Sequence, residues 1–353
     1  MPKFIINGDF LCRNLTGIER FAFEICEQLD KLVEKDYIGI FIPKNAKIIP
    51  DFKNINIYIS DKEIKSFPKW SFFNYGNFLI KNKVIGIDFS NTCSVRKPGV
   101  VFLHDIYCKM FPEDFKSFRD KIVKLYSCFM YYFVSKKAKL LLTVSDFSKK
   151  QISTTYKKNP DDIFVIPNGW DHFKKIKEDD SIFERFPTLK EKEFYFTLGS
   201  LSKRKNLKWI AEYASKNPEE NFAISGKILS GLVPEELKIL KQLKNVYLLG
   251  YVEDGEVKSL MKKCKAFIFP SYYEGFGIPP LEALSCGSKI IVSNATCLPE
   301  IYEDYAYYIN PFDTNIKLDE LLKNPVREPE KLLETYTYNN SAKKLVELLK
   351  KIN

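Results

Sequence analysis

Residues 269–284 read FPSYYEGFGIPPLEAL and predict the end of a buried strand, a loop and the start of a helix. A proline at position 280 suits the first helical turn, where its missing N–H has no intrahelical partner to lose. Gly275 and Gly277 can adopt positive φ, so the loop backbone can turn its N–H groups toward a ligand. Glu274 and Glu282 could then grip two hydroxyl-bearing parts of one ligand. A helix-dipole role for Glu282 and a solvated loop position for Glu274 explain the same two residues.

Strand-like segments alternate with helical segments along the whole chain. The expected strands are 3–7, 37–42, 55–59, 84–87, 100–103, 140–144 and 163–166 in the first half, and 194–198, 221–224, 246–249, 266–269, 289–292 and 306–309 in the second. Nearly continuous apolar strands between helices are typical of parallel sheets covered on both faces. The sequence therefore predicts an α/β protein of two doubly wound domains, with ligands bound in a cleft outside the carboxyl ends of the strands.

A polar, charged stretch separates the two halves and gives the domain boundaries. We expect residues 1–170 to form the N-terminal domain, 171–192 a linker, 193–335 the C-terminal domain and 336–353 a basic amphipathic helix.

The composition of the 353 residues is that of a globular protein, with 45% hydrophobic and 28% charged residues and a net charge of +10. No apolar stretch approaches the roughly 20 residues that a spanning helix needs, and the N-terminus has no signal-peptide pattern. Eight cysteines without a C-x-x-C pair favour free thiols in a reducing cytoplasm. With only His104 and His172 present, a His-rich metal site is not expected.

A second corner at residues 198–207, LGSLSKRKNL, again predicts a strand, a loop and a helix. Three consecutive cations, Lys203, Arg204 and Lys205, stand at the expected helix N-terminus, where N–H groups and the dipole already favour an anion. A bound diphosphate would relieve this repulsion, with Arg204 as a bidentate donor and Lys205 as a point charge. A solvated lysine-rich loop is the plainer alternative.

These two corners resemble signatures of the retaining family 4 glycosyltransferases of the bacterial surface-polysaccharide and lipopolysaccharide type. Glu274 and Glu282 match the E-x7-E signature of that family, and residues 199–206 match its Lys-Asn loop. The similarity continues through 249–252 (LGYV), 282–287 (EALSCG) and 298–301 (LPEI), and more loosely through 16–21 (TGIERF), 103–106 (LHDI), 143–145 (TVS) and 166–169 (IPNG). The resemblance implies the GT-B fold, in which two Rossmann-like domains face a central cleft and the last helix crosses back onto the first domain.

The resemblance also implies roles for single residues. Arg204 and Lys205 would neutralise the diphosphate of a nucleotide sugar, Glu282 would accept hydrogen bonds from the ribose, and Glu274 would hold the donor sugar. The loop backbone at Gly275, Phe276, Gly277 and Ile278 would give further donor contacts, and Tyr251 and Val252 would lie near the base. Ser200 would also contact the donor, at a position where many members carry arginine.

Two residues of the first half complete the implied site. Gly17 would let the backbone approach a phosphate at the start of a helix, although a tight turn also explains a glycine there. His104 follows a predicted strand and precedes Asp105, which implies a catalytic place beside the donor sugar and the acceptor hydroxyl. A lone histidine in a core is the alternative.

The implied reaction is transfer of a hexose-type sugar with retained configuration and no metal, since the chain offers a basic loop and no D-x-D triplet. The expected location is the cytoplasm, at most peripheral on the inner face of the membrane, and the acceptor a glycan or lipid-linked saccharide. The alternatives are an inactive GT-B binding or scaffold partner and a GT-B nucleotide-sugar 2-epimerase.

Two aromatic stretches bear on a membrane partner. Residues 65–83 hold four lysines, six aromatic residues and no acid, which favours an acceptor or anionic-membrane surface made by Lys65, Lys69, Trp70, Phe72 and Phe73. Burial of these aromatic side chains in the N-terminal core is the alternative. For the aromatic residues of 126–133 we expect burial in the core. No nucleic-acid-binding motif accompanies the basic charge.

Overall fold

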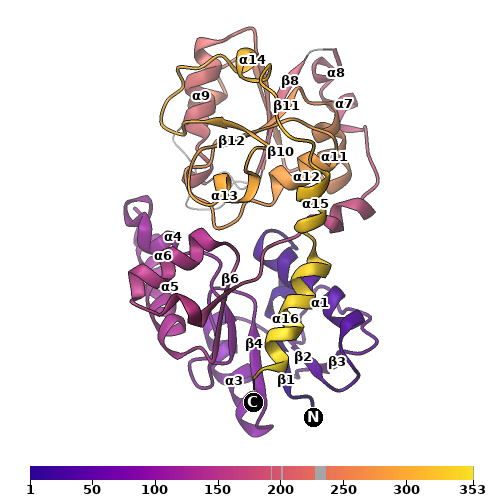
Figure 1. Cartoon of the computed structure of the whole chain (residues 1–353), viewed down its shortest axis with the longest axis vertical. Coiled ribbons are helices and arrows are strands. Elements are labelled where there is room, and N and C mark those ends of the chain that lie inside the picture. Colours follow the sequence, from indigo (N-terminus) through magenta and orange to yellow (C-terminus); the bar gives the residue numbers. More distant parts are fainter. Residues whose placement is uncertain (192, 200–201, 227–235, 353) are drawn as a thin grey trace. The chain divides into compact units, whose positions relative to one another are not determined.

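The computed structural model describes residues 1–191, 193–199, 202–226 and 236–352. Two parallel sheets organise the chain (Figure 1), with strand orders β3-β2-β1-β4-β5-β6-β7 and β10-β9-β8-β11-β12-β13. The contacts divide it into two compact units, Met1–Gly169 with Tyr336–Asn353, and Trp170–Thr335. The predicted fold class of two parallel-sheet α/β domains is therefore confirmed.

Unit 1 consists of the following elements: β1 Phe4–Asn7, η1 Gly8–Cys12, α1 Ile18–Leu32, β2 Ile38–Ile42, β3 Asn56–Ile59, α2 Phe67–Lys69, η2 Trp70–Tyr75, α3 Gly76–Lys81, β4 Ile85–Asp88, β5 Val100–Phe102, α4 Tyr107–Met110, η3 Pro112–Asp114, α5 Phe118–Lys137, β6 Leu140–Thr143, α6 Asp146–Tyr156, η4 Pro160–Asp162, β7 Ile163–Val165 and α16 Tyr338–Lys350. Strand order reverses between β1 and β4, which is the switch point of this sheet.

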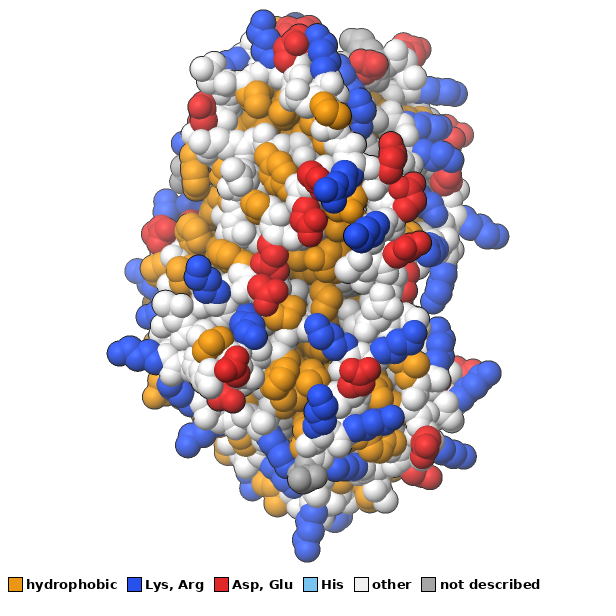
Figure 2. Space-filling model, viewed as in Figure 1, with side chains coloured by type: hydrophobic (Ala, Val, Ile, Leu, Met, Phe, Trp, Pro, Cys, Tyr) orange, Lys and Arg blue, Asp and Glu red, His pale blue; other side chains and the backbone are white. Residues whose placement is uncertain are grey.

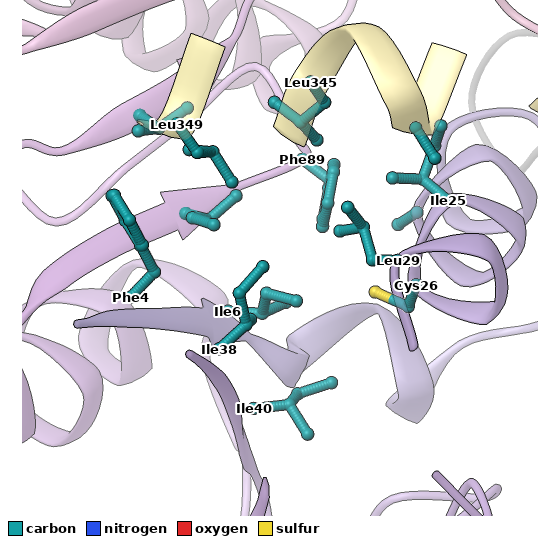
Figure 3. Packing of buried hydrophobic residues seen from close by; sticks show 14 of the residues in the cluster. Phe4, Ile6, Ile25, Cys26, Leu29, Ile38, Ile40, Phe89, Leu345 and Leu349 are labelled. Carbon is teal, nitrogen blue, oxygen red and sulfur yellow. The ribbon is translucent and has the colours of Figure 1, made fainter. Parts of the chain in front are cut away.

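Helices cover both faces of the unit 1 sheet. Alternate residues of a strand point to opposite faces, and here both sets are apolar and need to be covered. On one face, α1 packs with its predicted apolar stripe, including Phe21, Ile25 and Leu29, and α16 adds Leu345 and Leu349 (Figure 3). On the other face, Val101 and Leu103 pack against α5 and α6. Residues 67–81 cover β1 and β2 on this same face. The last helix of the chain is thus part of the first unit's core.

Unit 2 consists of these elements: η5 Asp171–Lys175, α7 Ile182–Arg185, α8 Thr188–Glu191, β8 Phe194–Leu198, η6 Lys203–Lys205, α9 Leu207–Lys216, β9 Asn221–Ser225, α10 Glu236–Leu240, β10 Val246–Gly250, α11 Asp254–Lys263, β11 Ala266–Phe269, α12 Pro279–Ser285, β12 Ile290–Ser293, α13 Leu298–Tyr302, β13 Tyr307–Ile309, α14 Leu318–Leu321 and α15 Glu330–Thr335. The chain runs from β8 outward to β10 and then returns to place β11 beside β8. The switch point of this sheet therefore lies between β8 and β11.

Residues 171–192, expected to be a linker, differ from that expectation over their described part. They form η5, α7 and α8, and Ile182, Phe183 and Leu189 are buried in unit 2. Phe173 is buried as well, so four apolar side chains anchor this mostly polar stretch in unit 2, and the Arg185–Glu256 ion pair adds to this.

The surface of the face drawn in Figure 2 carries more Lys and Arg than Asp and Glu side chains, as the net charge of +10 leads one to expect. All eight cysteines hold free thiols. Within the described residues, none of the helices combines the length and the apolar character needed to cross a membrane.

Candidate donor site at the carboxyl edge of the second sheet

The two corners singled out in the sequence lie next to each other in unit 2. β8 leads into the loop of Lys203–Lys205, and β11 leads into the loop that carries Glu274. The two strands pair in parallel, with Ala266 beside Tyr195 and Phe267 beside Phe196. Their carboxyl ends consequently share one edge at the switch point, where ligands of doubly wound sheets bind.

Three charged side chains meet at this edge. The Arg204 Nη1 atom lies 2.6 Å from Glu274 Oε2, and the Lys205 Nζ atom lies 2.7 Å from Glu274 Oε1. The side chains of Glu274 and Lys205 are only 6% and 14% exposed, so both interactions are largely shielded from water. Two cations around one carboxylate leave one net positive charge, which is the electrostatic prerequisite for binding an anion.

Backbone and amide contacts hold the two loops together. Asn206 adopts left-handed φ and ψ of 59° and 46°, and its Nδ2 donates to the carbonyl oxygens of Pro270 at 3.0 Å and Pro311 at 2.7 Å. The Tyr272 amide donates to the Arg204 carbonyl at 3.0 Å, and Arg204 Nη1 also donates to the Tyr273 carbonyl at 3.2 Å. These hydrogen bonds fix the positions of the two loops that carry the charged side chains.

Gly199 lies against the end of the Lys205 side chain. A Cβ at Gly199, whose φ is +152°, would lie 3.3 Å from Lys205 Cε and 3.7 Å from Nζ. The ammonium also lies over the Phe269 ring, 4.4 Å from its centre. These three residues line a crevice of about 10 Å³, which is room for about one water molecule.

Burial and charge shift the pKa values of the cluster. Burial lowers the pKa of Lys205 from 10.5 to about 8, and Arg204 adds to this, while Glu274 acts in the opposite direction. Burial by itself would raise the pKa of Glu274, but the neighbouring Arg204 and Lys205 outweigh it and hold that pKa below its usual value. Glu274 is thus ionised near neutral pH. Lys205 carries its charge near neutral pH and loses it around pH 8.

The loop after Glu274 is held by side chains from α13 and from the two residues before it. Thr296 Oγ1 accepts a hydrogen bond from the Glu274 amide at 3.2 Å, and the Cys297 thiol donates to the carbonyls of Glu274 and Phe276, both at 3.3 Å. Gly277 has a φ of +88°, as its sequence position allows, and the Tyr302 hydroxyl donates to its carbonyl. Among the described residues, Gly275 is not one of the glycines with positive φ.

Glu282 belongs to the first turn of α12 and has a separate partner. Its Oε1 lies 3.1 Å from His172 Nε2, and the side chains of Glu282 and His172 are both buried. The structure thus joins Arg204, Lys205 and Glu274 directly, whereas Glu282 forms a pair of its own with the start of η5.

The remaining donor contacts implied by the resemblance have different surroundings. Tyr251 is exposed after β10, and Val252 beside it is buried. Phe276 is buried and Ile278 is half-buried, at the start of α12. Ser200 lies outside the described residues.

The two candidate residues of unit 1 lie at the carboxyl edge of its own sheet. Gly17 caps α1 with a φ of +54°, and a Cβ there would meet open space. His104 follows β5 and is buried, with its ring 5.0 Å from that of Phe21 and its Nε2 2.7 Å from the Phe89 carbonyl. Burial lowers the pKa of His104, so the neutral imidazole is favoured.

The expected acceptor or membrane surface is only partly exposed. Trp70 contradicts the expectation, because it packs on Phe41 and its Nε1 donates to Asn7 Oδ1 at 3.0 Å in the core. The indole offers a donor that the buried Asn7 can accept, which accounts for its inward position. The other four residues of that set, Lys65, Lys69, Phe72 and Phe73, are exposed.

The expectation for 126–133 is wrong in part. Met130 and Tyr131 are buried, but Phe129 and Tyr132 are exposed on the same helix.

Sequence reasoning missed three residues that shape the site. His172 was considered only as a metal ligand, and nothing in its spacing connects it with Glu282. Asn206 was read as part of a motif, without its role as a brace, although its position after a cationic loop is a signal for a left-handed turn residue. Cys297 was counted among buried thiols and supports the Glu274 loop.

No group of three His, Cys, Asp or Glu side chains in the described parts of the chain is placed to hold a metal ion.

Comparisons with known proteins relate this chain to glycosyltransferases. The family model described as "Glycosyl transferases group 1" matches residues 178–342. The O-antigen chain mannosyltransferase RfbU of Salmonella typhimurium is 29% identical over 357 residues, covering 95% of this chain and 96% of that protein. The O-antigen chain mannosyltransferase B of Escherichia coli is 32% identical over 192 residues, covering 50% of this chain and 49% of the relative, so that match spans about half its length.

The fold is also found among solved structures. Anabaena Alr3699/HepE in complex with UDP and glucose has a TM-score of 0.68 with this chain at 16% identity, covering 99% of this chain and 100% of the other. The two parallel-sheet units have the fold of the GT-B glycosyltransferases, and residues 178–342 match the domain of the group 1 glycosyl transferases.

Proposed function

We propose that this chain is a retaining glycosyltransferase that moves a hexose from a nucleotide sugar to a glycan or lipid-linked acceptor in cell-surface polysaccharide assembly. The near full-length similarity to an O-antigen chain mannosyltransferase makes mannose the first sugar to test. The observation that carries the proposal is the Arg204–Lys205–Glu274 cluster at the switch point, with two cations on one carboxylate and one positive charge left for a diphosphate.

In the proposed reaction, the bond between the sugar C1 and the diphosphate oxygen breaks while the acceptor oxygen bonds to C1. Negative charge builds up on the departing diphosphate, and the acceptor proton passes to its leaving oxygen. In this proposal Arg204 and Lys205, which lie together at the carboxyl edge of the sheet, contact the diphosphate and stabilise that charge electrostatically. Attack on the same face as the departing group retains the configuration at C1.

The two glutamates divide the rest of the donor in this proposal. Glu274, together with backbone N–H groups of the loop at Gly275–Ile278, holds the sugar. Glu282 accepts hydrogen bonds from the ribose hydroxyls, and His172 at 3.1 Å fixes its orientation. The exposed Tyr251 and its neighbour Val252 lie beside the base.

We assign the residues of unit 1 to the acceptor side of the reaction. Within unit 1, the neutral His104 offers a hydrogen bond to the acceptor hydroxyl, and Gly17 leaves the start of α1 open to a phosphate. The cations of the cluster take the place that a divalent metal would have, so we propose transfer without a metal ion, at the cytoplasmic side of the membrane.

The test is a donor screen followed by a turnover assay. Thermal unfolding is measured with GDP-mannose, UDP-galactose, UDP-glucose, dTDP-rhamnose and ADP-glucose, because a ligand of the folded state raises its apparent stability. At least one donor should raise the midpoint and be consumed, slowly by water or rapidly with acceptor. Stabilisation without any consumption would instead indicate a binding partner, and a changed sugar on an intact nucleotide would indicate an epimerase. A screen in which no donor has any effect would overturn the proposal.

A further inference from the structure

α5 carries an apolar stripe that faces solvent. Phe118, Ile122, Leu125, Phe129 and Tyr132 follow one another at intervals of four and three residues and are 80%, 54%, 73%, 54% and 56% exposed. Such intervals place side chains on one face of a helix. The stripe runs along about 21 Å of helix, at 1.5 Å per residue.

This stripe lies outside the packed core of unit 1. The opposite face of α5 already packs into unit 1 through Met130, Tyr131 and Val134, which join Val101 and Leu141 in one apolar cluster. α5 is thus apolar on two sides. Large apolar side chains in contiguous exposure mark interaction sites, since isolated ones are the norm on a protein surface.

The charges around the stripe are almost all positive. α5 contains the cations Arg119, Lys121, Lys124, Lys136 and Lys137. Its single acid, Asp120, is occupied in the capping box with Ser117 at the start of the helix. The preceding η3 carries two acids, and Asp114 of these accepts the Tyr107 hydroxyl.

We propose that the stripe of α5 docks onto an anionic membrane surface. An aromatic and aliphatic face rimmed by lysine and arginine matches both layers of that partner, the acyl boundary and the negative headgroups. A second copy of the chain fits less well, because two such stripes face to face would bring cations against cations. This proposal goes beyond the sugar-transfer function and does not depend on it. It assigns membrane contact to α5 instead of residues 65–73, where the sequence predicts it.

The experiment is vesicle co-sedimentation of the full chain without any nucleotide sugar. The vesicles contain phosphatidylglycerol with phosphatidylethanolamine, or phosphatidylcholine alone. The test variant is Leu125→Ser/Phe129→Ser, and the matched control is Ile48→Ser/Ile49→Ser, which removes two other exposed apolar side chains of unit 1. Both variants keep their buried contacts, so unchanged thermal unfolding is expected and is checked.

The wild type and the control should bind phosphatidylglycerol vesicles, and the α5 variant should bind at least tenfold less. Binding should weaken at high salt and on phosphatidylcholine. The following results would overturn the proposal. These are no binding by the wild type, equal binding by the α5 variant, and a change of oligomeric state in the α5 variant with vesicle binding intact. If Phe72→Ser/Phe73→Ser alone abolishes binding, the surface lies at 65–73 instead. Failure here leaves the donor screen unaffected, so the two proposals fail separately.

Discussion

Replacing Lys205 by methionine removes one cation of the cluster while keeping a side chain of similar length. Glu274 retains Arg204 at 2.6 Å after this change, so the buried carboxylate is not left alone. Lys205 can therefore be tested for anion binding with little risk to the fold. Lys208→Met is the matched control, since Lys208 is exposed on the next turn and only forms a surface pair with Glu212 at 3.6 Å.

The size of the effect follows from the pKa of Lys205. A fall from 10.5 to about 8 means that the site disfavours the charged ammonium by about 3 kcal/mol relative to water. A diphosphate that reverses this effect regains that free energy on binding. Lys205→Met should therefore weaken binding of a nucleoside diphosphate by about two orders of magnitude, whereas Lys208→Met should change it little.

The same reasoning gives a dependence on pH. The free protein has Lys205 charged below about pH 8, and the complex keeps it charged to higher pH. Above about pH 7 the terminal phosphate of the nucleotide is ionised, so the affinity of the wild type should be constant from there to about pH 8 and fall above it, with uptake of a proton on binding. Lys205→Met should lose this dependence.

Isothermal titration with GDP and UDP, in buffers of different ionisation enthalpy, measures both the affinity and the proton uptake. The reasoning is refuted if folded Lys205→Met binds as tightly as Lys208→Met. It is also refuted if the wild-type affinity stays flat through the alkaline range.

Three further changes test the frame of the site and the buried charges. Glu274→Gln leaves two cations without their carboxylate and should cost about 3 kcal/mol in urea unfolding, and sugar transfer should fall by orders of magnitude. Gly277→Ala should destabilise by about 1 kcal/mol more than Gly287→Ala in thermal unfolding, because both have positive φ but only the former Cβ would lie 2.8 Å from Leu298. Burial raises the pKa of Asp88 well above its usual value, so the native state keeps a proton that the unfolded state has lost, and stability falls as pH rises above about 4. Asp88→Asn should reduce that fall, to which buried Asp9 with its pKa raised to about 6 also contributes, and urea midpoints near pH 4 and near pH 7 measure the difference.

The two sheets could be predicted because parallel strands are buried on both faces and read as apolar runs. The stripe of Phe21, Ile25 and Leu29 likewise carried enough periodicity to identify α1. The proximity of Lys205 and Glu274 could also be predicted, because the two loops follow adjacent parallel strands that end at the same edge of the sheet.

Other features depend on packing that no local pattern contains. The sequence of an aromatic-rich helix such as α5 does not show whether its second apolar face is buried or exposed to solvent. The exposure of Phe129 could therefore not be predicted from the sequence. The position of Trp70 depends on Asn7, a partner far away in the chain. The His172–Glu282 pair joins the start of η5 to α12 and forms only once unit 2 is folded.

The central claim is that the Arg204–Lys205 cations receive the diphosphate of the donor, and a crystal structure with GDP or UDP bound tests it most directly. The account predicts diphosphate oxygens within about 3 Å of Lys205 Nζ or the Arg204 guanidinium, with the ribose hydroxyls on Glu282. A nucleotide bound elsewhere, with both cations still closed on Glu274 and touching no phosphate, would contradict it.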